Sequence, residues 1–172
     1  VTCYQEDIPA NQLENWAKIQ SDRFKHNVIR GFHTELETVY EEKNMSLTKD
    51  SRKLLEKLLS ALYKNHPYGT QTVLGSQEHL KNPSITNIKN YYAKWYVPNN
   101  MAICMSGDFD FDEAMDIIEK YFGDMQPNDS LQMLQFEPEE EITSPVEVDV
   151  WGLEAECLAL AWRFPGASSQ EA

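Results

Sequence analysis

The chain has 172 residues, 41% of them apolar, which is enough for one domain with a core and too little for two full ones. Its formal net charge of −13 gives a surface that repels phosphate backbones, so the composition argues against nucleic-acid binding. The apolar stretches are far shorter than the roughly 18–20 residues that a membrane span needs, and no membrane-spanning helix is expected.

Five helices are predicted from apolar residues that recur at helical spacing. They cover residues 11–24, 31–45, 49–63, 85–95 and 111–122. Asn11 and Glu14 have the spacing of a capping box at the start of the first helix, and Asp110 or Asp112 is placed to cap the last one. The leucines of the third helix fall on one face, which is typical of a helix that packs against a core.

Four segments are expected to be β-strands, because they are apolar throughout or alternate between apolar and polar residues. They are residues 1–6, 101–106, 146–150 and 157–164. The order of helices and strands predicts an α+β fold, with several helices packed on one face of a mostly antiparallel sheet. The first strand begins at Val1 without a Met, so we expect the sequence to be part of a longer chain.

The predicted helix over 31–45 carries four glutamates. Glu35 and Glu42 are seven positions apart, so at about 100° per residue their directions differ by only about 20°. Glu37 and Glu41 fall on the opposite side and form a like-charge pair, which is favourable only in water. We therefore expect Glu35 and Glu42 at the border of the core, where a carboxylate needs a cation, a donor or a metal. Periodicity alone also allows ordinary surface glutamates.

The histidines and cysteines show no local metal-binding spacing. No two histidines form H-x-x-H, H-E-x-x-H or H-x-x-E-H, since in Gly75–His79 a glycine stands where the last pattern needs its first histidine. The acidic run over 137–141 is expected to be a solvated loop. Three cysteines in apolar stretches, without a C-x-x-C pair, are expected to be buried free thiols: Cys3, Cys104 and Cys157.

Three motifs follow one another with a consistent order and spacing. They are Phe32–Asn44; Ala61–Gly69 with Val73–Gly75; and Tyr92–Met101 with Ser106–Asp108. Together they resemble the pitrilysin/insulinase (inverted-zincin) family of zinc peptidases. The resemblance spans about residues 1–125 and is weaker to residue 164.

In that family an H-x-x-E-H segment supplies two zinc-binding histidines and a glutamate general base, and a later glutamate completes the zinc site. The resemblance implies that Glu42 is this zinc ligand and that Glu35, seven positions earlier, supports catalysis. It also implies a zinc cofactor, peptide substrates and hydrolysis by a zinc-activated water. Helical geometry singles out the same two glutamates.

The H-x-x-E-H segment does not occur in residues 1–172. The resemblance therefore implies one incomplete peptidase-like domain over 1–172, with a helical part over 1–80 and a strand-helix-strand part over 81–172. Alone, such a chain is expected to be inactive and not to hold zinc tightly, because one carboxylate is a poor zinc site. Its expected partners are peptide substrates, the remainder of a longer chain, and a second copy through an uncovered sheet edge or apolar face.

Two other functions stay open at this point. The chain could belong to a non-catalytic relative that serves as a structural or substrate-binding subunit, although such a relative has no physical need to keep both Glu35 and Glu42. It could also be an acidic α+β interaction module without catalysis, because a fold resemblance alone does not determine activity.

Overall fold

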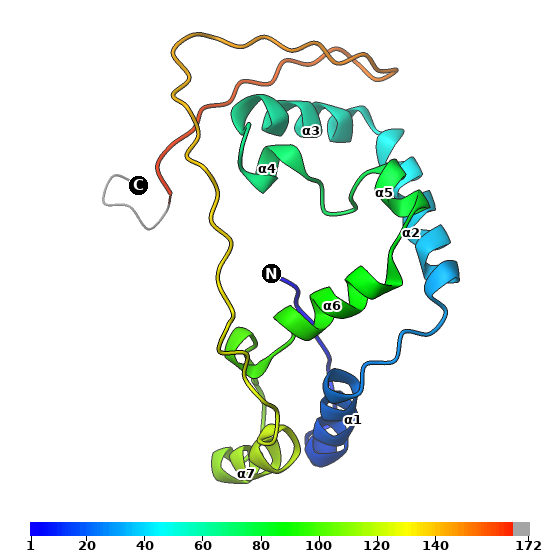
Figure 1. Ribbon diagram of the computed structural model, residues 1–172, viewed down its shortest axis with the longest axis vertical. Helices are drawn as coiled ribbons and strands as arrows, with labels where there is room; N and C mark the ends of the chain where they lie inside the picture. The colour runs from blue at the N-terminus through cyan, green and yellow to red at the C-terminus, as the bar shows by residue number, and fades with distance from the viewer. Residues whose placement is uncertain (167–172) are drawn as a thin grey trace. The chain divides into compact units, whose positions relative to one another are not determined.

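The computed structural model of this chain describes residues 1–166, which form helices joined by extended segments (Figure 1). It divides into two compact units, each made from two stretches of the chain. The first unit comprises Val1–Arg30 and Ser84–Gln132. The second comprises Gly31–Pro83 and the described part of Met133–Ala172. Among the described residues, no helix has the length and apolar character that crossing a membrane requires.

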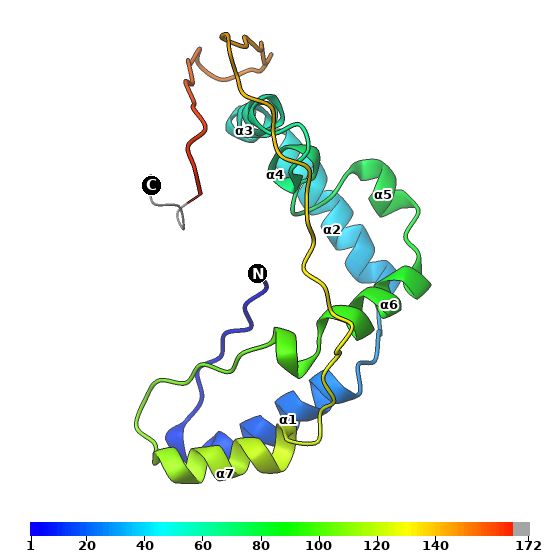
Figure 2. The same cartoon turned by 60° about the vertical axis from the view of Figure 1, so that its left-hand side comes forward.

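The first unit is centred on two helices that pack side by side, α1 and α7 (Figure 2). Its helices are η1 (Ala10–Gln12), α1 (Leu13–Lys25), α6 (Ile85–Trp95), η2 (Pro98–Asn100) and α7 (Phe111–Phe122). The small side chains of Ala17 and Ala114 are 0% and 3% exposed, so the two helix backbones can approach closely. Asp110 caps α7 by accepting a hydrogen bond from the Glu113 N–H at 2.9 Å, as the sequence predicts.

The segment before α1 is attached to the first unit by polar and aromatic contacts. The Glu6 carboxylate accepts hydrogen bonds from Trp16 Nε1 at 2.8 Å and from Gln20 Nε2 at 2.6 Å. The Tyr4 hydroxyl lies 3.1 Å from the Tyr96 hydroxyl, and this hydrogen bond, with partial burial, raises the pKa of Tyr4 to about 12. The Arg23 guanidinium lies 4.7 Å from the centre of the Tyr4 ring.

The second unit contains four helices of the middle of the chain, of which α2 packs against α3 and α5, and α3 against α4. They are α2 (Phe32–Leu47), α3 (Asp50–Leu62), α4 (Pro67–Thr70) and α5 (Gln77–Lys81). Gly31 precedes α2 with a φ of 61°, a left-handed conformation that glycine adopts at little cost. Ser76 caps α5 by accepting from the His79 N–H at 3.2 Å.

A long extended segment, residues 133–166, completes the second unit, and we call it the strap. It runs past α3 and returns beside its own outward path (Figure 1). The Asp50 carboxylate at the start of α3 accepts hydrogen bonds from the backbone N–H groups of Leu153 and Glu154 at 2.6 and 2.7 Å. A Cβ atom at Gly152 would collide with this carboxylate, so the close approach depends on glycine.

The prediction of an α+β fold with an antiparallel sheet is wrong for the described residues. Residues 1–166 contain helices and turns and no β-strand. No ladder of backbone–backbone hydrogen bonds joins any of the four segments predicted as strands to a second segment. An alternating apolar pattern indicates which side chains would share one face of a strand. A strand forms only where a second segment supplies the partners for its backbone hydrogen bonds.

Two smaller predictions also need correction. Cys3, Cys104 and Cys157 are free, as predicted, but exposed rather than buried, because the extended segments that carry them are not covered. Glu14 does not form a capping box, since its carboxylate instead accepts from Lys120 Nζ at 2.5 Å and from the Tyr121 hydroxyl at 3.0 Å. These contacts join α1 to α7, and the hydrogen bonds from Lys120 and Tyr121 lower the pKa of Glu14.

Candidate functional site

The two glutamates singled out by the sequence, Glu35 and Glu42, lie on α2 in the second unit. Helix geometry puts them on one face, about 20° apart. Both are exposed, so they lie further from the core than the predicted border position. Leu36 and Val39, on the neighbouring side of α2, are half-buried. The pair is therefore open to solvent, and a ligand could reach both carboxylates from outside.

A buried ion pair fixes the rotation of α2 next to this face. Lys43 is 5% exposed, and its Nζ donates to Glu56 Oε1 of α3 at 2.9 Å and to the Thr72 hydroxyl at 3.4 Å. A buried ammonium group is unfavourable unless it is paired, so α2 is stable chiefly in the rotation that turns Lys43 toward α3. That rotation turns the neighbouring Glu42 toward solvent.

The other two glutamates of α2 line a shallow groove against α5. Glu37 and Glu41 are exposed, as predicted, and border this groove together with Leu36, Tyr40, Leu80 and Lys81. Lys81 Nζ lies 5.8 Å from the centre of the Tyr40 ring, within the range of a cation–π contact. The groove therefore combines apolar side chains with two carboxylates. It lies on the side of α2 away from Glu35 and Glu42.

The described residues do not fit a complete zinc site. Within residues 1–166, no group of three or more histidine, cysteine, aspartate or glutamate side chains is arranged to hold a metal. His66 Nδ1 accepts from the Tyr68 N–H at 3.2 Å, and His79 is exposed on the short α5. A zinc site needs about four ligands, and this chain offers Glu42 as a single candidate.

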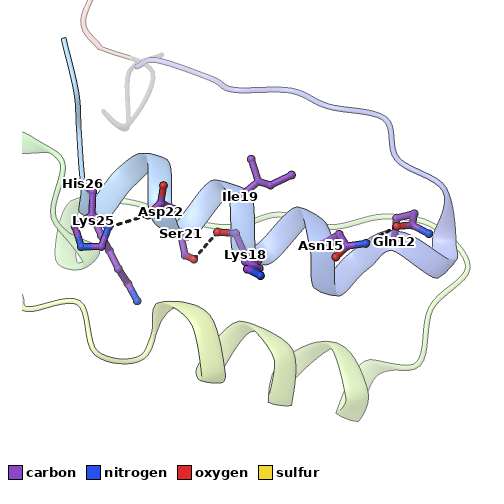
Figure 3. Close-up of a pocket in the computed structure, with 8 residues that line it drawn as sticks. All are labelled: Gln12, Asn15, Lys18, Ile19, Ser21, Asp22, Lys25 and His26. Carbon is purple, nitrogen blue, oxygen red and sulfur yellow. Dashed lines mark hydrogen bonds and ion pairs between the residues drawn. The ribbon is translucent and has the colours of Figure 1, made fainter. Parts of the chain in front are cut away.

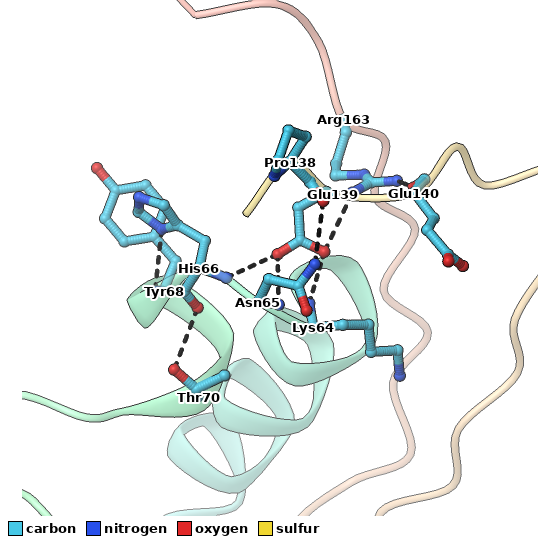
Figure 4. A network of polar contacts seen from close by, with 9 residues as sticks. All are labelled: Lys64, Asn65, His66, Tyr68, Thr70, Pro138, Glu139, Glu140 and Arg163. Atoms are coloured by element: carbon cyan, nitrogen blue, oxygen red, sulfur yellow. Dashed lines mark hydrogen bonds and ion pairs between the residues drawn. The ribbon is translucent and has the colours of Figure 1, made fainter. Parts of the chain in front are cut away.

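Glu139 is a residue that sequence reasoning missed. It lies in the acidic run predicted to be a solvated loop, yet its side chain is only 13% exposed. Its carboxylate accepts from the backbone N–H groups of Lys64, Asn65 and His66 at 2.8, 2.7 and 2.7 Å (Figure 4). Burial opposes ionisation of Glu139, but these three N–H groups and the nearby Arg163 lower its pKa on balance.

One local signal could have pointed to this contact. Lys64, Asn65 and His66 lie in the turn between α3 and α4, so their N–H groups have no helical carbonyl acceptor and need another one. The sequence does not show which acid supplies the acceptor, because several acids of the run have the same charge. Only the placement of the strap selects Glu139.

A surface depression on α1 belongs to the first unit and contains no converging functional groups. Figure 3 shows contacts between neighbouring polar residues along this segment, and Lys25 pairs with Asp124 outside the depression. His26 Nδ1 lies 2.9 Å from Asp22 Oδ1, and the Ser21 hydroxyl donates to the Lys18 carbonyl at 3.1 Å. The lining residues are Gln12, Asn15, Lys18, Ile19, Ser21, Asp22, Lys25 and His26.

Comparison with known proteins identifies relatives that are named as zinc proteases or as a peptidase subunit. The chain is 25% identical over 124 residues to an uncharacterized zinc protease of Mycobacterium leprae, covering 71% of this chain and 28% of that protein. It is 26% identical over 124 residues to the uncharacterized zinc protease YmxG of Bacillus subtilis, covering 71% and 30%. It is 31% identical over 68 residues to the mitochondrial-processing peptidase subunit beta of Saccharomyces cerevisiae, covering 40% and 14%.

The chain therefore spans less than a third of the length of these relatives. A family model described as the Peptidase M16 inactive domain matches residues 82–172, which is more than half of the chain. The match includes the strap but not α2, which carries Glu35 and Glu42. This chain belongs to the M16 peptidases, the pitrilysin/insulinase family.

Proposed function

We propose that this chain is part of a zinc-dependent metalloendopeptidase that hydrolyses peptides, and that Glu42 is a zinc ligand and Glu35 a supporting acid in the parent protein. The observation that carries the proposal is the pairing of both carboxylates on one open face of α2 in a chain whose relatives are named zinc proteases. The mycobacterial and Bacillus relatives also support a bacterial origin.

The proposed division of roles follows from what each residue can do in this chain. Glu42 offers a negatively charged oxygen, the kind of ligand that complements histidines around zinc. Glu35 lies about two helical turns away on the same face, where it could act on the zinc ligands without binding the metal itself. The bound metal would supply an activated water, and the remaining ligands and the general base would come from the rest of the parent protein. The isolated chain is accordingly proposed to be inactive, as an incomplete domain whose parts are residues 1–80 and 81–172.

A second candidate function has support of its own. The matched family model is described as an inactive domain, and it covers the second half of this chain. The chain could then come from a non-catalytic subunit or a non-catalytic half that contributes structure or substrate contacts beside an active partner. In that case Glu35 and Glu42 would be surface acids without a metal.

The test uses the full-length parent protein, with metal content and peptidase rate measured together. Glu42→Gln is expected to lose zinc and activity, because a neutral amide is a poor zinc ligand. Glu35→Gln is expected to lose activity while keeping more of its zinc. Glu41→Gln, an exposed glutamate on the other side of the same helix, is the matched control and should change neither quantity.

Three results would decide against the proposal. Full zinc content and full activity in Glu42→Gln would show that Glu42 is not a ligand. A parent protein that binds no zinc in any form would support the non-catalytic subunit instead. Stoichiometric zinc binding by residues 1–172 alone, through His66 or His79, would contradict the proposal that the site is completed outside this chain.

A further inference from the structure

The strap is attached to the second unit at a small number of polar contacts. Among residues 133–166 the structure contains no backbone–backbone hydrogen bond. The contacts instead gather near the two ends of α3, at Glu139 and at Asp50. A segment held by so few bonds is of the kind that opens locally without unfolding the rest of a protein.

The first attachment joins the strap to the turn after α3. The Glu139 carboxylate accepts hydrogen bonds from the three consecutive backbone N–H groups of Lys64–His66 (Figure 4). Asn65 Nδ2 donates to the Pro138 carbonyl at 3.0 Å. Arg163 Nη1 lies 3.6 Å from the Glu139 carboxylate and its Nη2 donates to the Glu140 carbonyl, so the returning part of the strap closes on the same point. The ionised carboxylate is essential here, because it only accepts hydrogen bonds.

The second attachment has the reverse arrangement. Here the carboxylate belongs to α3, since Asp50 accepts from the Leu153 and Glu154 N–H groups of the strap. The Glu154 N–H, and after it the Lys53 ammonium 2.9 Å away, lower the pKa of Asp50. The two attachments therefore use different carboxylates, different N–H groups and opposite ends of one helix.

The strap segment between the two attachments is longer than the distance along α3 that it has to cover. The 13 residues of α3 span about 20 Å. The strap residues from Glu139 to Leu153 could span about 46 Å if fully extended. Because the path is longer than the helix it follows, one end can separate without pulling on the other.

We propose that the strap is a releasable segment with two independent attachments, and that Glu139 opens the first of them while Asp50 retains the second. Loss of the Glu139 contacts frees the N–H groups of Lys64–His66, the Arg163 guanidinium and the strap on either side of Leu153 and Glu154. The helices α2 and α3 keep their own packing in the opened state, because Lys43 and Glu56 join them without the strap.

Amide hydrogen exchange on residues 1–172 tests this proposal. Glu139→Gln should speed exchange at the Lys64, Asn65 and His66 amides by about threefold to tenfold and leave Leu153 and Glu154 unchanged. Asp50→Asn should have the reverse effect. Glu137→Gln, which removes the same charge from an exposed residue of the same run, should change neither set.

The proposal is overturned if either variant speeds exchange at both attachments, since the strap would then open as one unit. It is equally overturned if Glu139→Gln leaves the three amides unchanged. Should Glu139→Gln unfold the whole unit, seen as fast exchange throughout α3, Arg163→Gln provides the comparison with the carboxylate intact. Faster exchange at Lys64–His66 than at Leu153 and Glu154 in that variant supports independence, and equal acceleration refutes it.

Discussion

At the scale of single residues, ion pairs and charged hydrogen bonds hold neighbouring elements together, a role that buried apolar side chains have in proteins with a larger hydrophobic core. Only four apolar residues of the described chain are buried, namely Leu13, Ala17, Val97 and Ala114. Lys43, at 5% exposure, is buried more deeply than Leu13 and Val97, which are each 9% exposed. Stability in this chain should therefore respond strongly to the loss of one charged partner.

Lys43→Met tests the ion pair that sets the rotation of α2. Glu56 would keep its charge, 33% exposed, without its partner, and we expect a loss of about 2 kcal/mol in the free energy of unfolding. Chemical denaturation measures this loss. The control is Lys57→Met, because Lys57 is an exposed lysine that follows Glu56 on α3. Its free energy of unfolding should stay within about 0.5 kcal/mol of that of the unchanged protein. Equal stability of the two variants would remove Lys43 as the determinant of helix rotation.

The Tyr4–Tyr96 hydrogen bond predicts a dependence on alkaline pH. The pKa of Tyr4 is raised from 10.0 to about 12, so the folded state favours the neutral phenol. Its contribution to stability is complete below pH 10 and is lost as the pH rises toward about 12. An absorbance titration should show late phenol ionisation that is reduced in Tyr4→Phe, with a part remaining because burial also raises the pKa of Tyr92. If the late ionisation is reduced in Tyr91→Phe and not in Tyr4→Phe, it belongs to Tyr91 and the prediction for Tyr4 is wrong.

At the scale of elements, α7 is the helix whose start follows the local sequence signal most directly. Within the first unit, α7 begins at the capping residue Asp110 and meets α1 at Ala17 and Ala114. The positions of the extended segments instead depend on hydrogen bonds to residues that are distant in the sequence, such as those accepted by Asp50 and Glu139. Cap substitutions should therefore have local and predictable costs.

Asp110→Ala removes the acceptor for the first free N–H groups of α7. We expect a loss of about 1 kcal/mol in stability, together with fraying of the first turn of that helix. Thermal unfolding followed by circular dichroism measures both effects. Asp116→Ala, an exposed aspartate inside the same helix, is the control and should be neutral or slightly stabilising because alanine favours helix. A larger loss in the control would mean that the cap is not what stabilises α7.

At the scale of the whole molecule, the strap leaves many large apolar side chains in water. Leu158, Leu160 and Trp162 are 85%, 69% and 69% exposed. Exposed apolar groups of this kind mark surfaces that bind another chain or associate with copies of themselves. The sheet edge predicted as the route for self-association is absent from the described residues, and the apolar side chains of the strap are the surface on which we expect association.

We expect residues 1–172 to self-associate as concentration rises, in a manner that depends on the strap. Sedimentation velocity over a concentration series should show growing species for the unchanged chain. Replacing Leu158, Leu160 and Trp162 by serine should reduce them, because each change removes apolar area from the surface. Serine at Met133 and Leu134, which are exposed at the start of the strap, serves as the comparison. A monomer at every concentration would show that the exposed strap does not recruit a second copy.

The sequence by itself determined the five longer helices and the shared face of Glu35 and Glu42, because helical hydrogen bonds join residues only four positions apart. It left the cap of α7 open between Asp110 and Asp112, and the structure selected Asp110. Its three motifs also determined the family. Only the tertiary structure decided what the extended segments do, and it replaced the expected sheet by the strap. The physical reason is that their partners are remote: Glu139 reaches N–H groups 73 to 75 positions away, and Asp50 reaches 103 and 104 positions away. Local patterns do not encode such pairings, and this is why an acidic run expected to be solvated contains a nearly buried carboxylate.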